Sequence, residues 1–438
     1  MTRSSRIIKK LASWAIAALY HRVEVRQAPN LTAEGPELAN SSHFGGFTDP
    51  LLLVYAMDRV PRFVARDVIW KYPVVKSIMK WVKAIPVHKS DDGGATSNDT
   101  MFASTYAALE EGDLITIFPE GITVDDPSIA SIKTGSARIV LGARAAGVSG
   151  IKLLSAGIHY ENKAALRSEV FIDIGWPIDL DDFVSGYVSP GDPEDATNRD
   201  LVRALTDVME VNLREAAPNF ESWAIARSLS AASDVALRTN EHKDGIEVGH
   251  GDRERLARLL DEAPESERVA VSDAMDTYQA DLDAVGFNDE MLMSGMAKPS
   301  SFFVHLIMSL IIGIILIPFA LAGVIVNAIP MILLWLIGRL KVSDAMMATV
   351  KPIGAILVFG ITWGLWALYG WSVGGLNGLA GVLLLLPVFL FALIAIFERG
   401  ILVVAAIRGF SRSRSFANVY GQIQHHRREV VESVARAA

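Results

Sequence analysis

Two long stretches without charged side chains place the strongest constraint on this 438-residue chain. Residues 301–338 hold one titratable group, His305, and residues 352–397 hold no charged residue at all. The interior of a soluble protein is not free of charge over such lengths, whereas a bilayer core excludes charged groups. At a helical rise of about 1.5 Å per residue, each stretch is long enough for two passes, and the first is tight. We therefore expect transmembrane helices within residues 298–404.

Turn signals divide each stretch in two. Asn327 and Pro330 would mark the turn in the first, and residues 370–378, rich in glycine, would mark the turn in the second. A re-entrant hairpin is the alternative for the first stretch. The apolar stretches carry no acidic or basic residue inside, which argues against a transporter or a proton pathway.

Cations flank both stretches and indicate an orientation. They lie before, between and after the expected helix pairs: Lys298, Arg339, Lys341, Lys351, Arg399, Arg408, Arg412 and Arg414. The 370–378 segment has no charge. By the positive-inside rule, both chain ends face the cytoplasm. Residues 405–438 form a basic cytoplasmic tail, which either touches anionic lipid or forms a solvated helix.

Residues 1–26 are basic and amphipathic. Their apolar run, residues 11–20, is about half the length that a bilayer requires. No small-residue cleavage site follows it, so it does not resemble a signal peptide. We expect a helix that lies on a membrane surface with its basic face toward lipid headgroups. The alternative, a helix packed on the following domain, is compatible with this.

Residues 27–180 have the pattern of an α/β domain. Short apolar runs that predict buried strands alternate with helical patterns, which argues for a mixed sheet with helices on its faces. The predicted strands are 114–118, 151–154 and 170–174, and the predicted helices are 101–111 and 136–146.

Residues 181–297 are polar, acid-rich and mostly helical in pattern. Residues 199–213 have helical periodicity, and residues 239–252 have the composition of an exposed connection. We find no catalytic motif in this region.

Composition removes several classes of chemistry. The chain has no cysteine, which excludes disulfides, thiolate catalysis and cysteine-based metal sites. A net charge of −8 excludes binding of nucleic acid by bulk positive charge. His159, His242 and His250 lack the spacing of metal ligands, so we expect neither a metal nor another cofactor. No G-x-S-x-G elbow offers a nucleophilic serine.

The first motif with catalytic chemistry is the run 41–50, Ser-Ser-His-Phe-Gly-Gly-Phe-Thr-Asp-Pro. It places His43 and Asp49 six positions apart around a glycine pair. A carboxylate that fixes the tautomer of an imidazole turns it into a general base. The alternative is a loop histidine, with Asp49 capping a helix that starts near Pro50.

The second motif is the run 117–123, Ile-Phe-Pro-Glu-Gly-Ile-Thr, which directly follows a predicted strand. It would deliver Glu120 and exposed backbone N–H groups to the edge of the sheet, where open α/β sheets bind ligands. The carboxylate can hold polyol hydroxyls, and Thr123 with the N–H groups can bind phosphate. The alternative is a plain turn with a solvated glutamate.

Two further runs supply cations. Residues 84–89, Ala-Ile-Pro-Val-His-Lys, end on Lys89, and residues 133–138, Lys-Thr-Gly-Ser-Ala-Arg, open a predicted helix at Lys133. A cation at a helix N-terminus adds to a positive field suited to phosphate. The alternative for each is an ordinary surface cation.

Taken in order, these motifs resemble the glycerolipid acyltransferase superfamily, which comprises glycerol-3-phosphate and 1-acylglycerol-3-phosphate acyltransferases. The resemblance covers about residues 8–180, and Phe-Pro-Glu-Gly is its most specific block. Five residues between His43 and Asp49, the helical middle region and the paired hydrophobic segments resemble the yeast-type glycerol-3-phosphate acyltransferase branch.

The resemblance implies roles for particular residues. His43 would deprotonate the acceptor hydroxyl, and Asp49 would orient His43. Residues 156–160 would support the pocket. The residues implied to bind the glycerol phosphate are Glu120, Gly121, Thr123, Lys89, Arg66 and Lys133.

Two substitutions depart from the usual family pattern. Ser42 stands where asparagine is usual before the histidine, and Lys89 stands where arginine is usual. Lysine lacks the bidentate phosphate geometry of arginine. Both departures bear on substrate choice and on activity.

The resemblance implies a membrane-bound enzyme that transfers a fatty acyl group from acyl-CoA or acyl-carrier protein to glycerol-3-phosphate. One alternative acceptor is 1-acylglycerol-3-phosphate or another lysolipid. The other alternative is a non-catalytic membrane protein whose acyltransferase-like domain only binds lipid.

Overall fold

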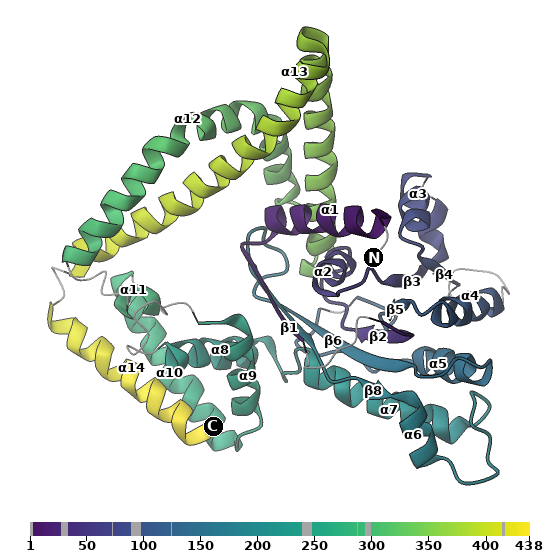
Figure 1. Cartoon of the computed structure of the whole chain (residues 1–438). Coiled ribbons are helices and arrows are strands. Elements are labelled where there is room, and N and C mark those ends of the chain that lie inside the picture. Colours follow the sequence, from purple (N-terminus) through teal and green to yellow (C-terminus); the bar gives the residue numbers. More distant parts are fainter. Residues whose placement is uncertain are drawn as a thin grey trace. The chain divides into compact units, whose positions relative to one another are not determined.

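The computed structural model describes residues 3–27, 34–71, 73–88, 98–123, 125–238, 248–286, 288–293, 299–413 and 417–438 (Figure 1). The chain divides into two compact units. Unit 1 comprises Met1–Asn219 and Val342–Thr349, and unit 2 comprises Phe220–Lys341 and Val350–Ala438. Each unit is considered by itself.

Unit 1 is built on one eight-stranded mixed sheet with the order β1-β7-β6-β2-β5-β3-β4, and β8 pairs with β6. Its strands are β1 (Arg22–Gln27), β2 (Glu37–Ser41), β3 (Arg62–Arg66), β4 (Ile85–Val87), β5 (Leu114–Ile117), β6 (Lys152–Tyr160), β7 (Glu169–Ile174) and β8 (Ile178–Asp179). The five neighbours β6, β2, β5, β3 and β4 are all parallel, while β7 and β8 run antiparallel to β6. Five strands therefore end at one common edge.

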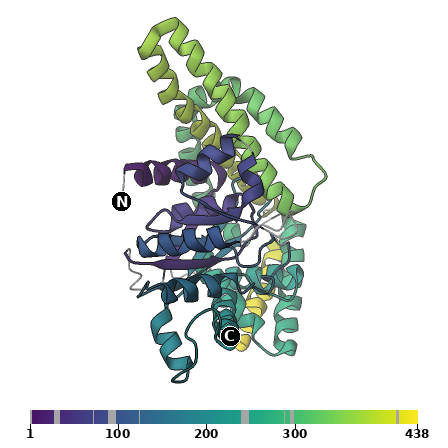
Figure 2. The ribbon, with the colours of Figure 1, turned by 90° about the vertical axis from the view of Figure 1, so that its right-hand side faces the viewer.

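Helices cover both faces of this sheet (Figures 1 and 2). On one face lie α4 (Asp99–Glu110), α5 (Gly135–Ala145) and α7 (Arg199–Ala216), which pack on the strands and on one another. On the other lie α1 (Arg3–Leu19) and α2 (Thr48–Ala56), packed together. The remaining helices are the 3₁₀ turn η1 (Asp67–Lys71), α3 (Pro73–Trp81) and α6 (Leu180–Tyr187).

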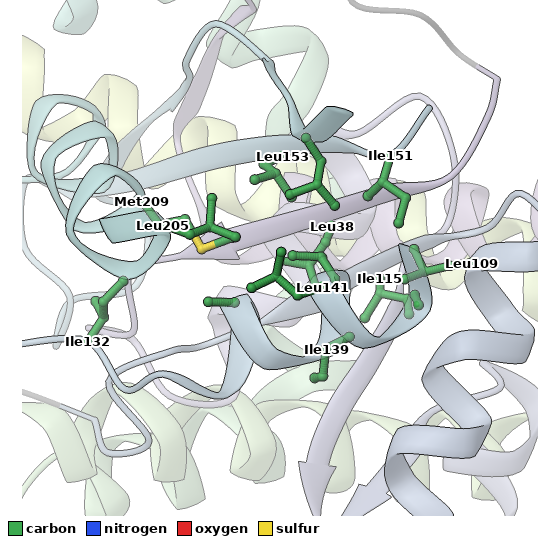
Figure 3. Close-up of a cluster of buried hydrophobic side chains, with 14 of the residues drawn as sticks. Leu38, Leu109, Ile115, Ile132, Ile139, Leu141, Ile151, Leu153, Leu205 and Met209 are labelled. Carbon is green, nitrogen blue, oxygen red and sulfur yellow. The ribbon is translucent and has the colours of Figure 1, made fainter. Parts of the chain in front are cut away.

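The core lies between the sheet and α5 and α7. Figure 3 shows Leu38 and Leu153 from the strands meeting Leu141 of α5 and Leu205 of α7. All five residues of β2 are buried, because helices cover both faces of this central strand. This packing holds in place the residues that follow the carboxyl end of β2.

The predicted strands and helices of the α/β domain are present, with three differences in extent. The N-terminal helix ends at Leu19, because residues 22–27 pair with β7 as an edge strand. Strand β6 continues to Tyr160. The compact unit ends at Asn219 rather than near residue 180, because α7 packs on β6 and β2.

Apart from its two longest helices, unit 2 is a cluster of helices. It contains α8 (Trp223–Leu237), α9 (His250–Asp261), α10 (Glu265–Val285), α11 (Asp289–Met293) and α14 (Ala417–Ala437). The connection expected at 239–252 is shorter than predicted, since α9 begins at His250, and residues 239–247 lie outside the described part.

The expected basic tail is instead a packed helix. In α14, Ile423, Val430 and Val434 are buried in the core that α8 and α10 share. The Arg427 Nε donates to Asp289 over 2.7 Å, next to the start of α11. The helix expected as one alternative is therefore present, but one of its faces packs in the core of unit 2 instead of being solvated all round.

Two helices, α12 (Pro299–Ile337) and α13 (Asp344–Ser413), are long and apolar enough to cross a membrane by length and composition. The apolar spans are Leu306–Ile337 and Met346–Gly400. The expected turn at residues 370–378 is present, because Gly375 takes φ 56° and ψ −138° and divides α13. The turn expected at Asn327 and Pro330 is wrong, since α12 continues through both residues.

Indole side chains explain how α12 passes Pro330 without a break. Proline has no N–H for the carbonyl of Val326, four residues earlier, and Trp366 Nε1 donates to that oxygen over 3.4 Å. Trp363 Nε1 donates to the side-chain oxygen of Asn327 over 2.9 Å, and Asn327 donates to Gly323. Figure 1 shows that α12 is bent.

Candidate active site

The common edge of the parallel strands gathers the motifs that the sequence singled out. Tyr160 ends β6, His43 follows β2, Glu120 follows β5, Arg66 ends β3 and His88 follows β4. Ligand sites of open α/β sheets lie beyond the carboxyl ends of the strands. This edge is therefore the candidate active site.

His43 and Asp49 form a hydrogen-bonded pair. His43 Nδ1 lies 2.8 Å from Asp49 Oδ2. The Asp49 side chain is fully buried, and 21% of the His43 side chain is exposed. A buried carboxylate that accepts from Nδ1 fixes the proton there and leaves Nε2 as the basic nitrogen. This is the geometry that a general base requires.

The buried carboxylate of Asp49 accepts further hydrogen bonds. The backbone N–H of Gly45 donates to it over 3.0 Å, and the hydroxyl of Tyr160 donates to Oδ1 over 2.5 Å. Burial together with the charge of Asp49 raises the pKa of Tyr160 well above its ordinary value. Tyr160 thus stays a proton donor, and its hydroxyl also meets Thr48.

The loop between His43 and Asp49 needs glycine at two positions. A Cβ on Gly45 would collide with the Tyr160 hydroxyl, and Gly46 has φ +60°. Asp49 lies in the first turn of α2, but its carboxylate binds Gly45 and His43 rather than capping the helix.

Phe118 supports the imidazole from one side. Its ring stacks on that of His43 with centroids 4.2 Å apart, and Phe63 stacks on Phe118 in turn. The motif Phe-Pro-Glu-Gly therefore supplies a platform for the histidine.

Glu120 occupies a different position from the one expected. Its side chain is buried, with Oε1 accepting from the backbone N–H of His43 over 3.0 Å and Oε2 accepting from that of Ala130 over 2.9 Å. Burial raises the pKa of Glu120. Because both oxygens bind the backbone, this geometry favours a role in holding two loops over the expected contact with substrate hydroxyls.

The loop after Glu120 meets the start of α5. Gly121 has φ +69°, and a Cβ built on it would lie 2.8 Å from Lys133 Nζ. The backbone N–H of Lys133 donates to Pro119. No side chain caps the N-terminus of α5 at Thr134, and Thr123 is exposed on the same loop. Lys133, Gly121 and the first N–H groups of α5 thus lie together.

Of the other two predicted cations, Arg66 and Lys89, the structure places only Arg66. Arg66 is exposed at the end of β3, two strands away from β2. Lys89 lies outside the described residues. Its neighbour His88 pairs with Asp67 through Nδ1 and Oδ2, 2.9 Å apart, and this hydrogen bond lowers the pKa of Asp67. Asn98 holds the backbone of His88.

Three features of the site were not identified in the sequence as such. They are the Tyr160 bond to Asp49, the stacking of Phe118 on His43 and the pairing of His88 with Asp67. Only the placement of residues 156–160 near the pocket was implied. In the part of the chain that the structure describes, no group of three or more histidine or acidic side chains is arranged to hold a metal ion.

These observations define an α/β domain with a buried His–Asp pair at the carboxyl edge of a mixed sheet. Comparison with known proteins agrees with this class. The family described as Acyltransferase matches residues 22–158. Two glycerol-3-phosphate O-acyltransferases of Saccharomyces cerevisiae are similar in sequence. Number 2 is 28% identical over 132 residues, and number 1 is 28% identical over 116 residues.

The matched segments cover 30% and 26% of this chain but only 17% and 15% of the yeast proteins, so the chain spans a small part of these relatives. A crystal structure of the 1-acyl-sn-glycerophosphate acyltransferase PlsC from Thermotoga maritima is similar over 48% of this chain and 78% of its own. Its TM-score is 0.36, with 19% identity. Residues 22–158 therefore match an acyltransferase family model, and part of this chain is similar in sequence to the two yeast glycerol-3-phosphate O-acyltransferases.

Proposed function

We propose that this protein is a membrane-bound O-acyltransferase that moves a fatty acyl group from acyl-CoA or acyl-carrier protein to a hydroxyl of glycerol-3-phosphate, in phospholipid biosynthesis. The observation that carries the proposal is the 2.8 Å bond between His43 Nδ1 and the buried Asp49. It leaves a basic Nε2 on a partly exposed ring at the ligand-binding edge of the sheet.

The reaction needs no acyl-enzyme. His43 Nε2 takes the proton of the acceptor hydroxyl as the hydroxyl oxygen attacks the thioester carbonyl carbon. The tetrahedral intermediate collapses, the C–S bond breaks, and the imidazolium returns its proton to the departing thiolate. Asp49 stabilises the imidazolium between these two steps. The products are the acylated glycerol phosphate and the free thiol.

The acceptor phosphate is expected at the start of α5. Lys133 supplies a positive charge beside Gly121, and the uncapped N–H groups of the helix add their dipole. Thr123 can donate from the same loop. Arg66 and Lys89 are proposed as further cations from β3 and β4, at the same edge of the sheet.

Glu120 is proposed as a positioning residue. By accepting from the backbone of His43 and of Ala130, it ties the catalytic loop to the segment that leads into α5. Glu120 would thereby fix the position of the general base relative to the proposed phosphate site.

The membrane attachment is proposed from α12 and α13. The helical cluster of unit 2 contains both the chain before α12 and α14 after α13, so these two ends lie on one side of the membrane. The segment between the helices, Val342–Thr349, belongs to unit 1, where Met347 and Ala348 are buried.

We propose that both helices return to the side on which they entered. The turn at Gly375 allows this for α13, and the bend in α12 allows it for a re-entrant helix. By the positive-inside rule, the flanking cations favour the cytoplasm as that side, and the acyltransferase domain is proposed to lie there. The exposed face of α1 is proposed to lie on the same membrane surface.

A transfer assay tests the function. Membranes containing the full chain are given labelled acyl-CoA with glycerol-3-phosphate or with 1-acylglycerol-3-phosphate in separate reactions, and acyl-carrier protein replaces CoA in a second series. The proposal predicts labelled lysophosphatidate from glycerol-3-phosphate. Product only from the acylated acceptor would move the enzyme one step later in the pathway, and no product from any pair would contradict enzymatic function.

A further inference from the structure

Helix α3 carries large apolar side chains that are nearly half exposed among the described residues. Ile78 is 47% exposed and Trp81 is 44% exposed, three positions apart on this nine-residue helix. Lys76 and Lys80 are exposed between and beside them. Exposed apolar side chains next to cations are the composition of a helix that lies in a membrane interface.

Charge singles out the same helix. The chain has a net charge of −8, yet residues 68–90 contain no carboxylate. They contain five lysines: Lys71, Lys76, Lys80, Lys83 and Lys89. Residues 1–23 also lack a carboxylate, and they contain Arg3, Arg6, Lys9, Lys10 and Arg22. An anionic surface attracts these two segments although it repels the chain as a whole.

Helix α1 has two distinct faces. Ile8, Ala12 and Ile16 are buried against the domain. Ile7, Leu11 and Trp14 point away from it with 46%, 55% and 56% of their surfaces exposed. Packing on the domain therefore buries only one apolar face of α1. The second apolar face is exposed and can contact a partner.

The two helices lie on one side of the unit. Figures 1 and 2 both place α1 and α3 on the same side of the sheet, away from α5 and α7. Each helix contributes one exposed tryptophan, and tryptophan is enriched where a bilayer meets water. The pattern repeats on two elements that are separated in the sequence by three strands.

We propose that α3 and α1 together form the bilayer-facing surface of unit 1, and that their partner is an anionic lipid bilayer. Trp14 and Trp81 would enter the interface, while the exposed cations of the two helices, such as Arg6, Lys10, Lys76 and Lys80, would bind lipid phosphates. The proposal rests on the membrane location in the proposed function and extends it to a second helix, α3. This surface would hold the sheet edge with His43 at a fixed height above the bilayer.

Site-directed spin labelling tests this in the full chain, because the protein has no cysteine of its own. Ile78→Cys and Leu11→Cys each receive a nitroxide in separate samples reconstituted in phosphatidylcholine vesicles with phosphatidylglycerol. Tyr187→Cys on α6 is the exposed control elsewhere in unit 1, and Ile325→Cys on α12 is the control for lipid. Collisions with oxygen and with a nickel chelate give the depth of each label.

The expected result is high oxygen and low nickel accessibility at residues 78 and 11, and the reverse at residue 187. Nickel accessibility at residue 78 equal to that at 187, while residue 325 remains in lipid, would overturn the proposal. Low accessibility to both reagents at residue 78 would also overturn it, because a protein partner or a second copy would then cover α3.

Charge reversal provides the matched comparison. The double variant Lys76→Glu/Lys80→Glu should move the label at residue 78 toward the aqueous phase. Arg199→Glu/Arg203→Glu on α7 changes the same charge and should leave the label in place. Transfer activity of the unlabelled protein in the same vesicles separates failure of the proposed reaction from failure of the proposed surface. An equal shift in both double variants would contradict recognition by α3.

Discussion

A single buried carboxylate organises the candidate site at the level of residues. Asp49 faces three donors, namely the His43 ring, the Gly45 backbone and the Tyr160 hydroxyl. A group that only accepts hydrogen bonds suits this position, and the charge it retains is the one that an imidazolium needs.

Asp49→Asn tests that requirement. The amide would bring a donor into a site that offers only donors, and it would favour the wrong tautomer of His43. We expect kcat to fall by about 10²–10⁴-fold with the fold intact. Steady-state transfer rates and circular dichroism of the purified variant check this. Near-normal kcat in a folded variant would show that Asp49 is not needed to orient the base.

Tyr160→Phe removes only the hydroxyl that binds Asp49. The loss of one hydrogen bond to a charged group corresponds to about a tenfold decrease in kcat. KM for the acceptor should be unchanged, because Tyr160 touches no substrate in this account. Tyr187→Phe on α6 is the control. A change in KM alone would assign Tyr160 to substrate binding, contrary to this geometry.

Glu120 gives a prediction about pH. Burial raises its pKa in the folded state, so between the ordinary glutamate value and the raised one the folded chain binds more protons than the unfolded chain. The free energy of unfolding therefore falls as pH rises through this window. Thermal unfolding across mildly acidic pH should show this slope in the wild type and a smaller one in Glu120→Gln. Identical slopes would contradict it.

The sequence predicted part of this site, and there is a physical reason for the limit. His43 and Asp49 lie on one short loop, so their spacing alone brings them together. Tyr160 lies 111 positions from Asp49 and reaches it only because β6 pairs with β2. Glu120 was recognised as a motif, but its partners, two backbone N–H groups, depend on how the loops fold.

At the level of elements, one of the two turns predicted within the apolar stretches is present and the other is not. Gly375 adopts a backbone conformation that other residues avoid, so glycine-rich residues 370–378 predicted a true turn. Asn327 and Pro330 were the weaker signal, because Trp366 of α13 donates to the Val326 carbonyl that proline leaves unpaired, and Trp363 donates to the Asn327 side chain. That compensation comes from a neighbouring helix and is invisible in the local sequence.

Asn327→Leu tests this compensation. The variant loses the bonds to Trp363 and Gly323 that link α12 to α13 and support the bent helix. We expect destabilisation of about 0.5–1.5 kcal/mol, typical of hydrogen bonds between membrane helices. Thermal unfolding in detergent measures it. Ile325→Leu, on the exposed face of α12, is the control and should change little. Equal effects of both variants would argue against a specific polar link.

At the level of the whole molecule, the sequence predicted the apolar stretches and their flanking cations. It did not predict that the chain after α13 packs back on the helices that precede α12. Only the packing of α14 on α8 and α10 shows that the chain after α13 returns to the cluster that precedes α12. The basic residues of α14 resemble a solvated tail until their partners, such as Asp289, are seen. An anchor that begins and ends on one side would keep the acyltransferase domain close to the bilayer.

The most direct measurement compares His43→Ala with the wild type in the transfer of labelled acyl-CoA to glycerol-3-phosphate, in reconstituted full-length protein. Binding of acyl-CoA is followed in parallel. We expect labelled lysophosphatidate from the wild type and a loss of about 10²–10⁴-fold or more in the variant, with acyl-CoA binding retained. Equal rates in the two proteins would contradict the assignment of His43 as the general base.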